Sequence, residues 1–172
     1  MDRQLLILRH AKSDWDAGAR TDYERPLSKR GRKAAKRIGR WLDASQFCPE
    51  LIISSPVVRA QQTAVSVARI LGLPDEAIHW DPAIYGATAL TLLSVIRGSS
   101  QSCRSVMLVG HNPGLEDLLL GLCVDDSPLL KGAKLLPTAA LAVLTTNASW
   151  ASLAPGDVVL RELVRPRELP AG

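Results

Sequence analysis

Two of the three histidines follow a short apolar segment, at the point where a buried strand is predicted to end. His10 comes after residues 5–8 and is preceded by Arg9, and His111 comes after residues 106–109. A neutral imidazole is a competent nucleophile at phosphorus, and a guanidinium binds two phosphate oxygens at once and keeps its charge at any working pH. These residue types therefore indicate chemistry on a phosphoryl group.

The predicted elements that position these side chains alternate between strands and helices over most of the chain. Such alternation is typical of a largely parallel sheet with helices on both faces. The last two strands have no helix between them, so we expect them to pair antiparallel at one side of the sheet. The predicted strands cover residues 4–8, 51–53, 78–80, 106–109, 139–145 and 158–164, and the predicted helices cover 29–44, 56–71, 88–97 and 114–123.

The sequence thus predicts an α/β fold, in a single three-layer domain with a mostly parallel central sheet and an antiparallel C-terminal strand pair. The domain is expected to span residues 1–172, with a core at about 4–164 and a flexible tail at 165–172. Serines are expected to begin two of the helices. Ser28 would cap the first, and Ser55 the second, with Pro56 at its first helical position.

Composition agrees with one compact globular domain, because the chain has 172 residues and 47% of them are apolar. The 21 basic and 17 acidic side chains give a net charge of +4, which favours anionic partners but is too small to indicate nucleic acid. Three widely spaced cysteines match neither a zinc site nor a disulfide scaffold, and no apolar run is long enough for a signal peptide or a membrane span. We therefore expect a cytoplasmic protein with no membrane partner.

The predicted site lies beyond the carboxyl ends of the strands, where ligands bind in open α/β sheets. Arg59 lies one turn into the second helix and is expected to join the strand-end residues at this edge. The N-terminus of that helix also favours a bound anion. We predict His10 as the nucleophile, with Arg9, Arg59 and a protonated His111 stabilising the phosphoryl oxygens in the transition state. Such a site requires neither a metal nor a cofactor.

Several segments resemble the signatures of a known family. The sequences RHA at 9–11, SSPVVRAQQT at 54–63 and GHNP at 110–113 look like the RHG, SSPxxRAxQT and GH motifs of the histidine phosphatase (phosphoglycerate mutase-like) superfamily. Within it, the short chain and the sequence RPLS at 25–28 are similar to the SixA-like phosphohistidine phosphatases. The resemblance runs from about residue 4 to about residue 164. It implies a phosphohistidine enzyme intermediate on His10, a phosphate pocket of Arg9, Arg59 and His111, and no metal.

Related mutases carry an acidic proton donor that has no assigned match in this chain. A phosphoramidate needs such an acid less than an ester does, because the leaving imidazole can itself carry the proton. The sequence therefore favours phosphohistidine on a protein as the substrate. Asp81 is the first candidate for a proton donor, ahead of Asp14, Asp16 and Glu116.

Other polar residues have two interpretations each. Arg25, Ser13 and Asn112 are candidate substrate-binding residues, although Arg25 can equally anchor a loop and the other two can cap turns. His79 is interpreted as a structural residue. The basic segment at 29–40 is by default a solvated helix face, and its alternative role is a docking surface for an acidic protein.

Three alternatives to a protein phosphohistidine phosphatase remain at this stage. One is a phosphatase of small phosphate esters or nucleotides. Another is a non-catalytic protein that binds phosphate or an acidic partner. The third is a metal site on His10 and His111 with Asp14 or Asp16, which is disfavoured because the neighbouring arginines would repel a cation.

Overall fold

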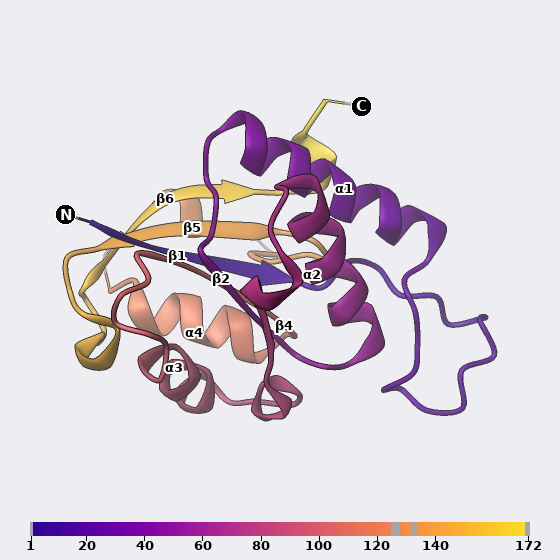
Figure 1. Ribbon diagram of the computed structural model, residues 1–172, viewed down its shortest axis with the longest axis horizontal. Coiled ribbons are helices and arrows are strands. Elements are labelled where there is room, and N and C mark those ends of the chain that lie inside the picture. The colour runs from indigo at the N-terminus through magenta and orange to yellow at the C-terminus, as the bar shows by residue number, and fades with distance from the viewer. Residues whose placement is uncertain (1, 125–127, 132–133, 171–172) are drawn as a thin grey trace.

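A mixed sheet forms the centre of the molecule, as a computed structural model of residues 2–124, 128–131 and 134–170 shows (Figure 1). Its strands lie in the order β3-β2-β4-β1-β5-β6. The four strands β1 to β4 run parallel, and β5 pairs antiparallel with both β1 and β6. The predicted α/β fold class is therefore confirmed. The strands are β1 (Arg3–Arg9), β2 (Leu51–Ser54), β3 (Ile78–Trp80), β4 (Ser105–Gly110), β5 (Leu141–Thr146) and β6 (Val158–Val164).

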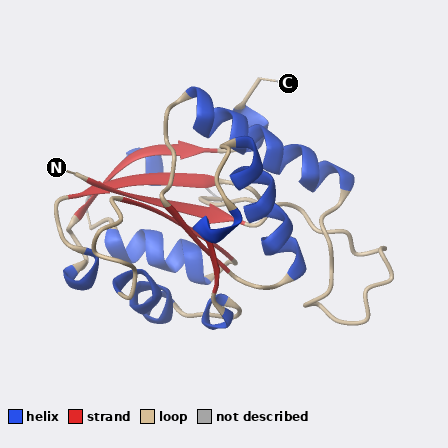
Figure 2. Ribbon diagram, in the orientation of Figure 1, coloured by secondary structure: helices blue, strands red, loops and turns tan. Residues whose placement is uncertain are grey.

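Helices cover both faces of this sheet (Figure 2). Alternate residues of β1 point to opposite faces. Leu5 and Ile7 pack in one buried cluster with residues of α3 and α4, while Leu6 and Leu8 pack in another with residues of α1 and α2. The core is thus split into two layers by the sheet. The helices are α1 (Lys29–Ala44), α2 (Val58–Ile70), α3 (Ala89–Arg97) and α4 (Gly114–Leu122).

The start of α1 is fastened to the loop that follows β1. Ser28 caps the helix as predicted, since its side chain accepts a hydrogen bond from the backbone of Gly31, and its own backbone N–H donates to the Lys12 carbonyl. Gly31 lies so close to this loop that a Cβ atom there would overlap the Lys12 carbonyl oxygen. The absence of a side chain at Gly31 therefore lets α1 and the loop after β1 approach each other.

The start of α2 differs from the prediction. The helix begins at Val58, with Val57 as its cap residue, so Pro56 lies outside it. The Ser55 hydroxyl does not cap the helix. It lies 2.8 Å from the Nε2 atom of His111, because β2 ends beside β4 and brings this serine to the strand-end edge.

The segment at 165–172 is predicted to be a flexible tail, and this stays a prediction. Its described residues, up to 170, fold back on α1, and residues 171–172 lie outside the described part of the chain. Pro166–Glu168 form a short 3-10 helix, η5, in which Pro166 is buried. Leu169 packs against the core layer that contains α1 and α2. Within the ranges that the structure describes, no helix is both long and apolar enough to cross a bilayer.

We predict that Gly31→Ala destabilises the protein by about 1–3 kcal/mol, because overpacking must displace the Lys12 backbone. The matched control is Gly121→Ala, also in a helix, where a Cβ meets no atom within 4 Å and helix propensity favours alanine. Thermal unfolding followed by circular dichroism measures both. Equal stability of the two variants would contradict the close packing at Gly31.

Candidate active site

Main-chain pairing brings the two strand-end histidines together. In the parallel register of β1 and β4, Arg9 pairs with Gly110, so His10 and His111 are the next residues on adjacent strands. The His10 N–H donates to the Gly110 carbonyl at 3.0 Å. The two imidazole ring centroids are 5.0 Å apart, although 100 residues separate them in the chain.

The tautomer of His10 follows from its hydrogen bond. Nδ1 lies 2.8 Å from the carbonyl oxygen of Ala11, which only accepts, so Nδ1 carries the proton. Burial has the largest effect and lowers the pKa of His10, and the positive charges of Arg59 and Arg9 lower it further. The hydrogen bond to the Ala11 carbonyl opposes this decrease, and the resulting pKa is about 3. The ring is therefore neutral at pH 7, and its Nε2 atom holds a free lone pair.

His111 lies between Ser55 and Tyr85. Its Nε2 atom is 2.8 Å from the Ser55 hydroxyl, and its ring meets the Tyr85 ring edge-on at 5.5 Å. Burial and then the charge of Arg59 lower the pKa of His111 to about 4, although Asp22 opposes the decrease. Burial and the nearby arginine thus disfavour a second positive charge on His111 when no phosphoryl group is bound. The predicted protonation of His111 concerns the transition state and stays a prediction.

Arg9 and Asn112 both bond to one backbone group. Arg9 Nη1 and Asn112 Nδ2 donate to the Leu136 carbonyl, at 2.9 and 3.0 Å. A carboxylate oxygen of Glu116 accepts the Leu136 N–H at 2.9 Å, so this backbone group is held from both sides. Arg9 has thereby a fixed orientation at the end of β1.

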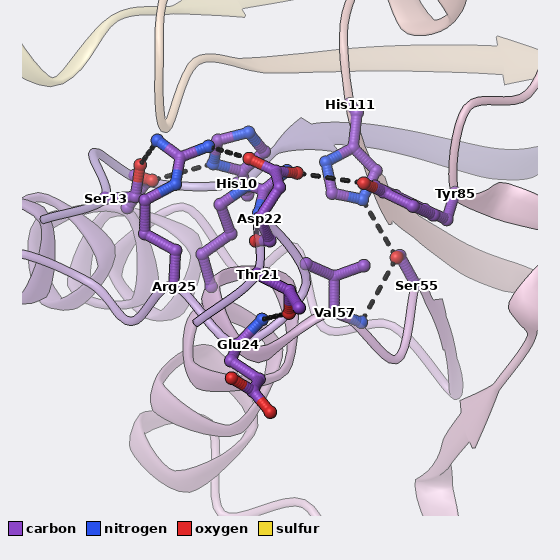
Figure 3. Close-up of polar contacts among 12 residues, drawn as sticks. His10, Ser13, Thr21, Asp22, Glu24, Arg25, Ser55, Val57, Tyr85 and His111 are labelled. Atoms are coloured by element: carbon purple, nitrogen blue, oxygen red, sulfur yellow. Dashed lines mark hydrogen bonds and ion pairs between the residues drawn. The ribbon is translucent and has the colours of Figure 1, made fainter. Parts of the chain in front are cut away.

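Asp22 is a member of the site that sequence reasoning missed. Its carboxylate forms ion pairs with Arg25 and Arg59 and accepts the Tyr85 hydroxyl at 2.9 Å (Figure 3). Burial opposes ionisation of Asp22, but hydrogen bonds from Arg25, from Tyr85 and from Arg59 outweigh it and lower its pKa to about 2. The Asp22 carboxylate therefore accepts hydrogen bonds from arginine N–H groups that could otherwise bind a phosphate. Tyr85 was missed as well, and neither residue belongs to a motif.

The loop that carries Asp22 is held by bonds to its surroundings. Arg25 Nη1 donates to the Ser13 hydroxyl at 2.7 Å, and the Arg25 guanidinium lies over the Trp15 ring at 3.5 Å. The Tyr23 carbonyl accepts the Val58 N–H, which ties the loop to the start of α2. The structure thus places Arg25 and Ser13 at the site.

Buried nitrogen atoms at this edge lack a hydrogen-bond partner among the described residues. They are the Nε atoms of Arg9, Arg25 and Arg59 and the Nδ1 atom of His111. Buried donors without partners are costly, and an anion with several acceptor oxygens can satisfy them. This arrangement is suited to a phosphate-sized oxyanion.

A pocket of about 830 Å³ opens beside these residues. Its lining contains Glu116 but does not contain Asp14, Asp16 or Asp81. Asp81 instead accepts the Ala83 N–H and caps a short 3-10 helix, so the structure does not bring the first candidate proton donor into the pocket. Seven of the lining residues are Arg9, His10, Ser13, Arg25, Arg59, Asn112 and Glu116.

Residues suited to a metal do not gather here. His79 is exposed on β3, at the sheet edge away from β1. The Asp14 carboxylate accepts the Asp16 N–H instead of approaching either strand-end histidine. The described part of the chain contains no cluster of three or more His, Cys, Asp or Glu residues that could hold a metal ion.

Comparisons with known proteins agree with this fold. The family model of the histidine phosphatase superfamily (branch 1) matches residues 5–82. An uncharacterized chloroplastic protein of Arabidopsis thaliana is 33% identical over 180 residues, covering 96% of this chain and 79% of that protein. The phosphohistidine phosphatase SixA of Escherichia coli K12 is 27% identical over 147 residues, covering 85% and 87%.

Solved structures show the same relationship. A protein of Agrobacterium tumefaciens, provisionally named as the phosphohistidine phosphatase SixA, is 31% identical, has a TM-score of 0.77 and covers 95% of this chain and 98% of its own. A SixA structure with tungstate has the same fold, at 24% identity and a TM-score of 0.80, covering 97% and 99%. The chain belongs to the histidine phosphatase superfamily. It is a SixA-like histidine-type phosphatase.

The low pKa values of the two strand-end histidines predict that both stay neutral down to about pH 5 in the free protein, since their pKa values are about 3 and 4. Arg59→Met should raise both pKa values, because the Arg59 charge opposes protonation of each ring. Imidazole NMR titration measures this. Arg69→Met, an exposed arginine at the other end of α2, serves as the control and should leave both unchanged.

Asp22→Ala should tighten the binding of inorganic phosphate roughly two- to fivefold, because a half-exposed carboxylate no longer competes for Arg25 and Arg59. Isothermal titration calorimetry with phosphate measures the affinity. Asp14→Ala, in the same loop, is the control. Weaker binding in Asp22→Ala would mean that the carboxylate positions the two arginines more than it competes with the ligand.

Proposed function

We propose that this phosphatase removes the phosphoryl group from phosphohistidine on proteins, with His10 as nucleophile. The observation that carries the proposal is the state of His10, whose ring is neutral, oriented by the Ala11 carbonyl and surrounded by arginine side chains. A buried imidazole with a low pKa keeps its lone pair available over the whole physiological pH range.

In the first step, the Nε2 lone pair of His10 attacks phosphorus and a new P–N bond forms. The P–N bond of the substrate breaks in line, and its electron pair goes to the substrate imidazole, which takes a proton from water or arrives already protonated. In the second step, water attacks phosphorus and the bond to Nε2 breaks. Inorganic phosphate leaves, the proton of the water goes to solvent, and His10 is restored.

Transition-state charge spreads over the three phosphoryl oxygens, and preorganised donors stabilise it. Arg59 and Arg9 supply permanent charge for this purpose, and both carry buried Nε atoms without a partner among the described residues. Burial and the charge of Arg59 lower the pKa of His111, but a bound phosphoryl dianion favours its protonation. It can then donate to an oxygen from Nδ1.

Two of the acidic residues, Asp22 and Asp81, support a P–N rather than a P–O substrate. Asp22 has a pKa of about 2 and is ionised at pH 7, so it has no proton to give. Asp81 does not line the pocket. An alkoxide leaving group benefits strongly from a general acid, whereas a leaving imidazole does not. The similarity to SixA of Escherichia coli, named a phosphohistidine phosphatase, supports the same substrate class.

A phosphate ester is the second candidate substrate, and one residue favours it. Glu116 lines the pocket and interacts electrostatically with Arg9, so it is the carboxyl group best placed to protonate an ester oxygen. The variant Glu116→Gln distinguishes between the two candidate substrate classes. It should lower the turnover of a sugar phosphate severely if esters are the substrate, and leave phosphohistidine turnover nearly unchanged if they are not.

The direct test compares turnover of a histidine-phosphorylated protein with turnover of sugar phosphates and nucleotides. We expect strong hydrolysis of phosphohistidine, loss of it in His10→Ala, and a decrease of about 10²–10³-fold in Arg59→Ala, which lacks a stabilising donor. Rapid quenching should trap an acid-labile phosphate on His10. His79→Ala, at an exposed histidine outside the pocket, is the control and should keep full activity.

An enzyme that hydrolyses esters or nucleotides but not phosphohistidine would contradict the proposed substrate. An active enzyme whose His79→Ala and His10→Ala variants behave alike, with no acid-labile phosphate, would contradict the covalent mechanism.

A further inference from the structure

Helix α1 carries a dense set of basic side chains outside the site. Its first acidic residue is Asp43, in the last turn. Among the described residues, no ion pair involves a basic side chain of this helix. The basic residues are Lys29, Arg30, Arg32, Lys33, Lys36, Arg37 and Arg40.

A groove of about 510 Å³ follows this basic surface between α1 and η5. Arg37 Nη1 is 3.4 Å from the Pro166 carbonyl oxygen, so the two walls are in contact. Figure 1 shows the C-terminal segment beside α1. We call this feature the basic groove, and its lining consists of Arg30, Lys33, Ala34, Lys36, Arg37, Arg40, Pro166 and Arg167.

The basic groove adjoins the pocket of the candidate active site. Arg30, Ala34, Pro166 and Arg167 line both. A chain segment attached to a phosphorylated side chain in the pocket can therefore extend into the groove. The part of α1 from Arg30 to Arg40 is about 15 Å long, which matches four to five residues of extended chain.

The charge distribution points to the chemistry of the occupant. Like charges three or four residues apart destabilise a helix, and Lys33 and Arg37 or Lys36 and Arg40 are such pairs. An acidic ligand removes this repulsion and meets complementary charge along the groove. We propose that the basic groove binds an acidic segment of the protein substrate that adjoins its phosphohistidine. This proposal rests on the proposed function.

Two other polyanions fit the groove less well. Single-stranded nucleic acids bind through aromatic side chains on which bases stack, and the groove lining contains none. Membrane-bound amphipathic helices insert their apolar face into lipid. The apolar face of α1 is unavailable, because Ile38 and Leu42 are buried in the core.

Three synthetic peptides of equal length, each with one central phosphohistidine, test the proposal. Their flanking residues are rich in glutamate, in serine or in lysine. At low salt we expect kcat/KM to be about tenfold higher for the acidic peptide than for the serine peptide, and lowest for the lysine peptide. Added salt should remove the difference, since it screens exposed charges. Equal kcat/KM for the three peptides would overturn the proposal.

Matched charge-reversal variants test whether the preference for the acidic peptide arises in the basic groove. K33E/R40E reverses two exposed groove residues, and the control R69E/R161E makes the same change in net charge on α2 and β6. K33E/R40E should lose the preference for the acidic peptide and still hydrolyse free phosphohistidine within about twofold of the unmodified protein. The control should keep the preference. Loss of the preference for the acidic peptide in both variants would show that the preference depends on the overall charge of the protein. This result would overturn the proposal.

Failure of the groove and failure of the proposed function are distinguishable. Free phosphohistidine reports on the active site alone, since it has no flanking residues. An unphosphorylated glutamate-rich peptide reports on the groove alone, through fluorescence anisotropy with the unmodified protein and with K33E/R40E. Binding of this peptide that K33E/R40E does not weaken would overturn the proposal. Tighter binding of single-stranded RNA or of anionic vesicles than of the peptide would also overturn it, and would assign the groove to that partner.

Discussion

The site depends above all on the register between β1 and β4. Because Arg9 pairs with Gly110, the residues that follow them lie side by side at the sheet edge. A shift by one residue would exchange the two faces of β1. Leu5 and Ile7 would then enter the other core layer, which Leu6 and Leu8 fill, and the mismatched packing would cost about 1–3 kcal/mol. The packing of the core therefore fixes the separation of the two imidazoles.

Burial of positive charge with little counter-charge explains the electrostatics of the site. Burial is the main cause that holds His10 and His111 in their neutral forms, and the charges of Arg59 and Arg9 act in the same direction. The Asp22 carboxylate balances part of this charge through its ion pair with Arg59. An arriving phosphoryl group brings two negative charges and relieves the remaining imbalance. In the proposed mechanism, the same interactions that suppress protonation of His10 thus favour both binding of the phosphoryl group and attack by the ring.

Strand-end residues could be predicted from the sequence, whereas loop residues could not. Apolar segments identified β1 and β4, and motif residues after them identified His10 and His111. Asp22 lies in an irregular loop, and its contact with Arg59 spans 37 residues. Its only local signal was the spacing of three residues from Arg25. Asp81 was chosen as an acid from its neighbours in sequence, but its carboxylate is engaged in capping.

Ser55 illustrates why a local rule can give the wrong partner. A serine before a proline at the start of a helix has the local sequence of a cap, and this pattern carries no information about the adjacent strand. The pairing of β2 with β4 places the Ser55 hydroxyl beside His111, so tertiary contact decides its role.

Specificity for a substrate cannot come from the phosphoryl group alone, because every phosphorylated molecule presents the same oxygens to the arginines. Two other features of the site can discriminate. Under the proposed function, the ionised carboxylate of Asp22 supplies no proton to the leaving group, which favours a substrate whose leaving group can carry the proton itself. The surface that continues from the pocket, along Arg30 and Arg167, acts on whatever is attached to the phosphorylated side chain. Under the two proposals, the first feature favours P–N over P–O bonds, and the second favours one phosphohistidine protein over another.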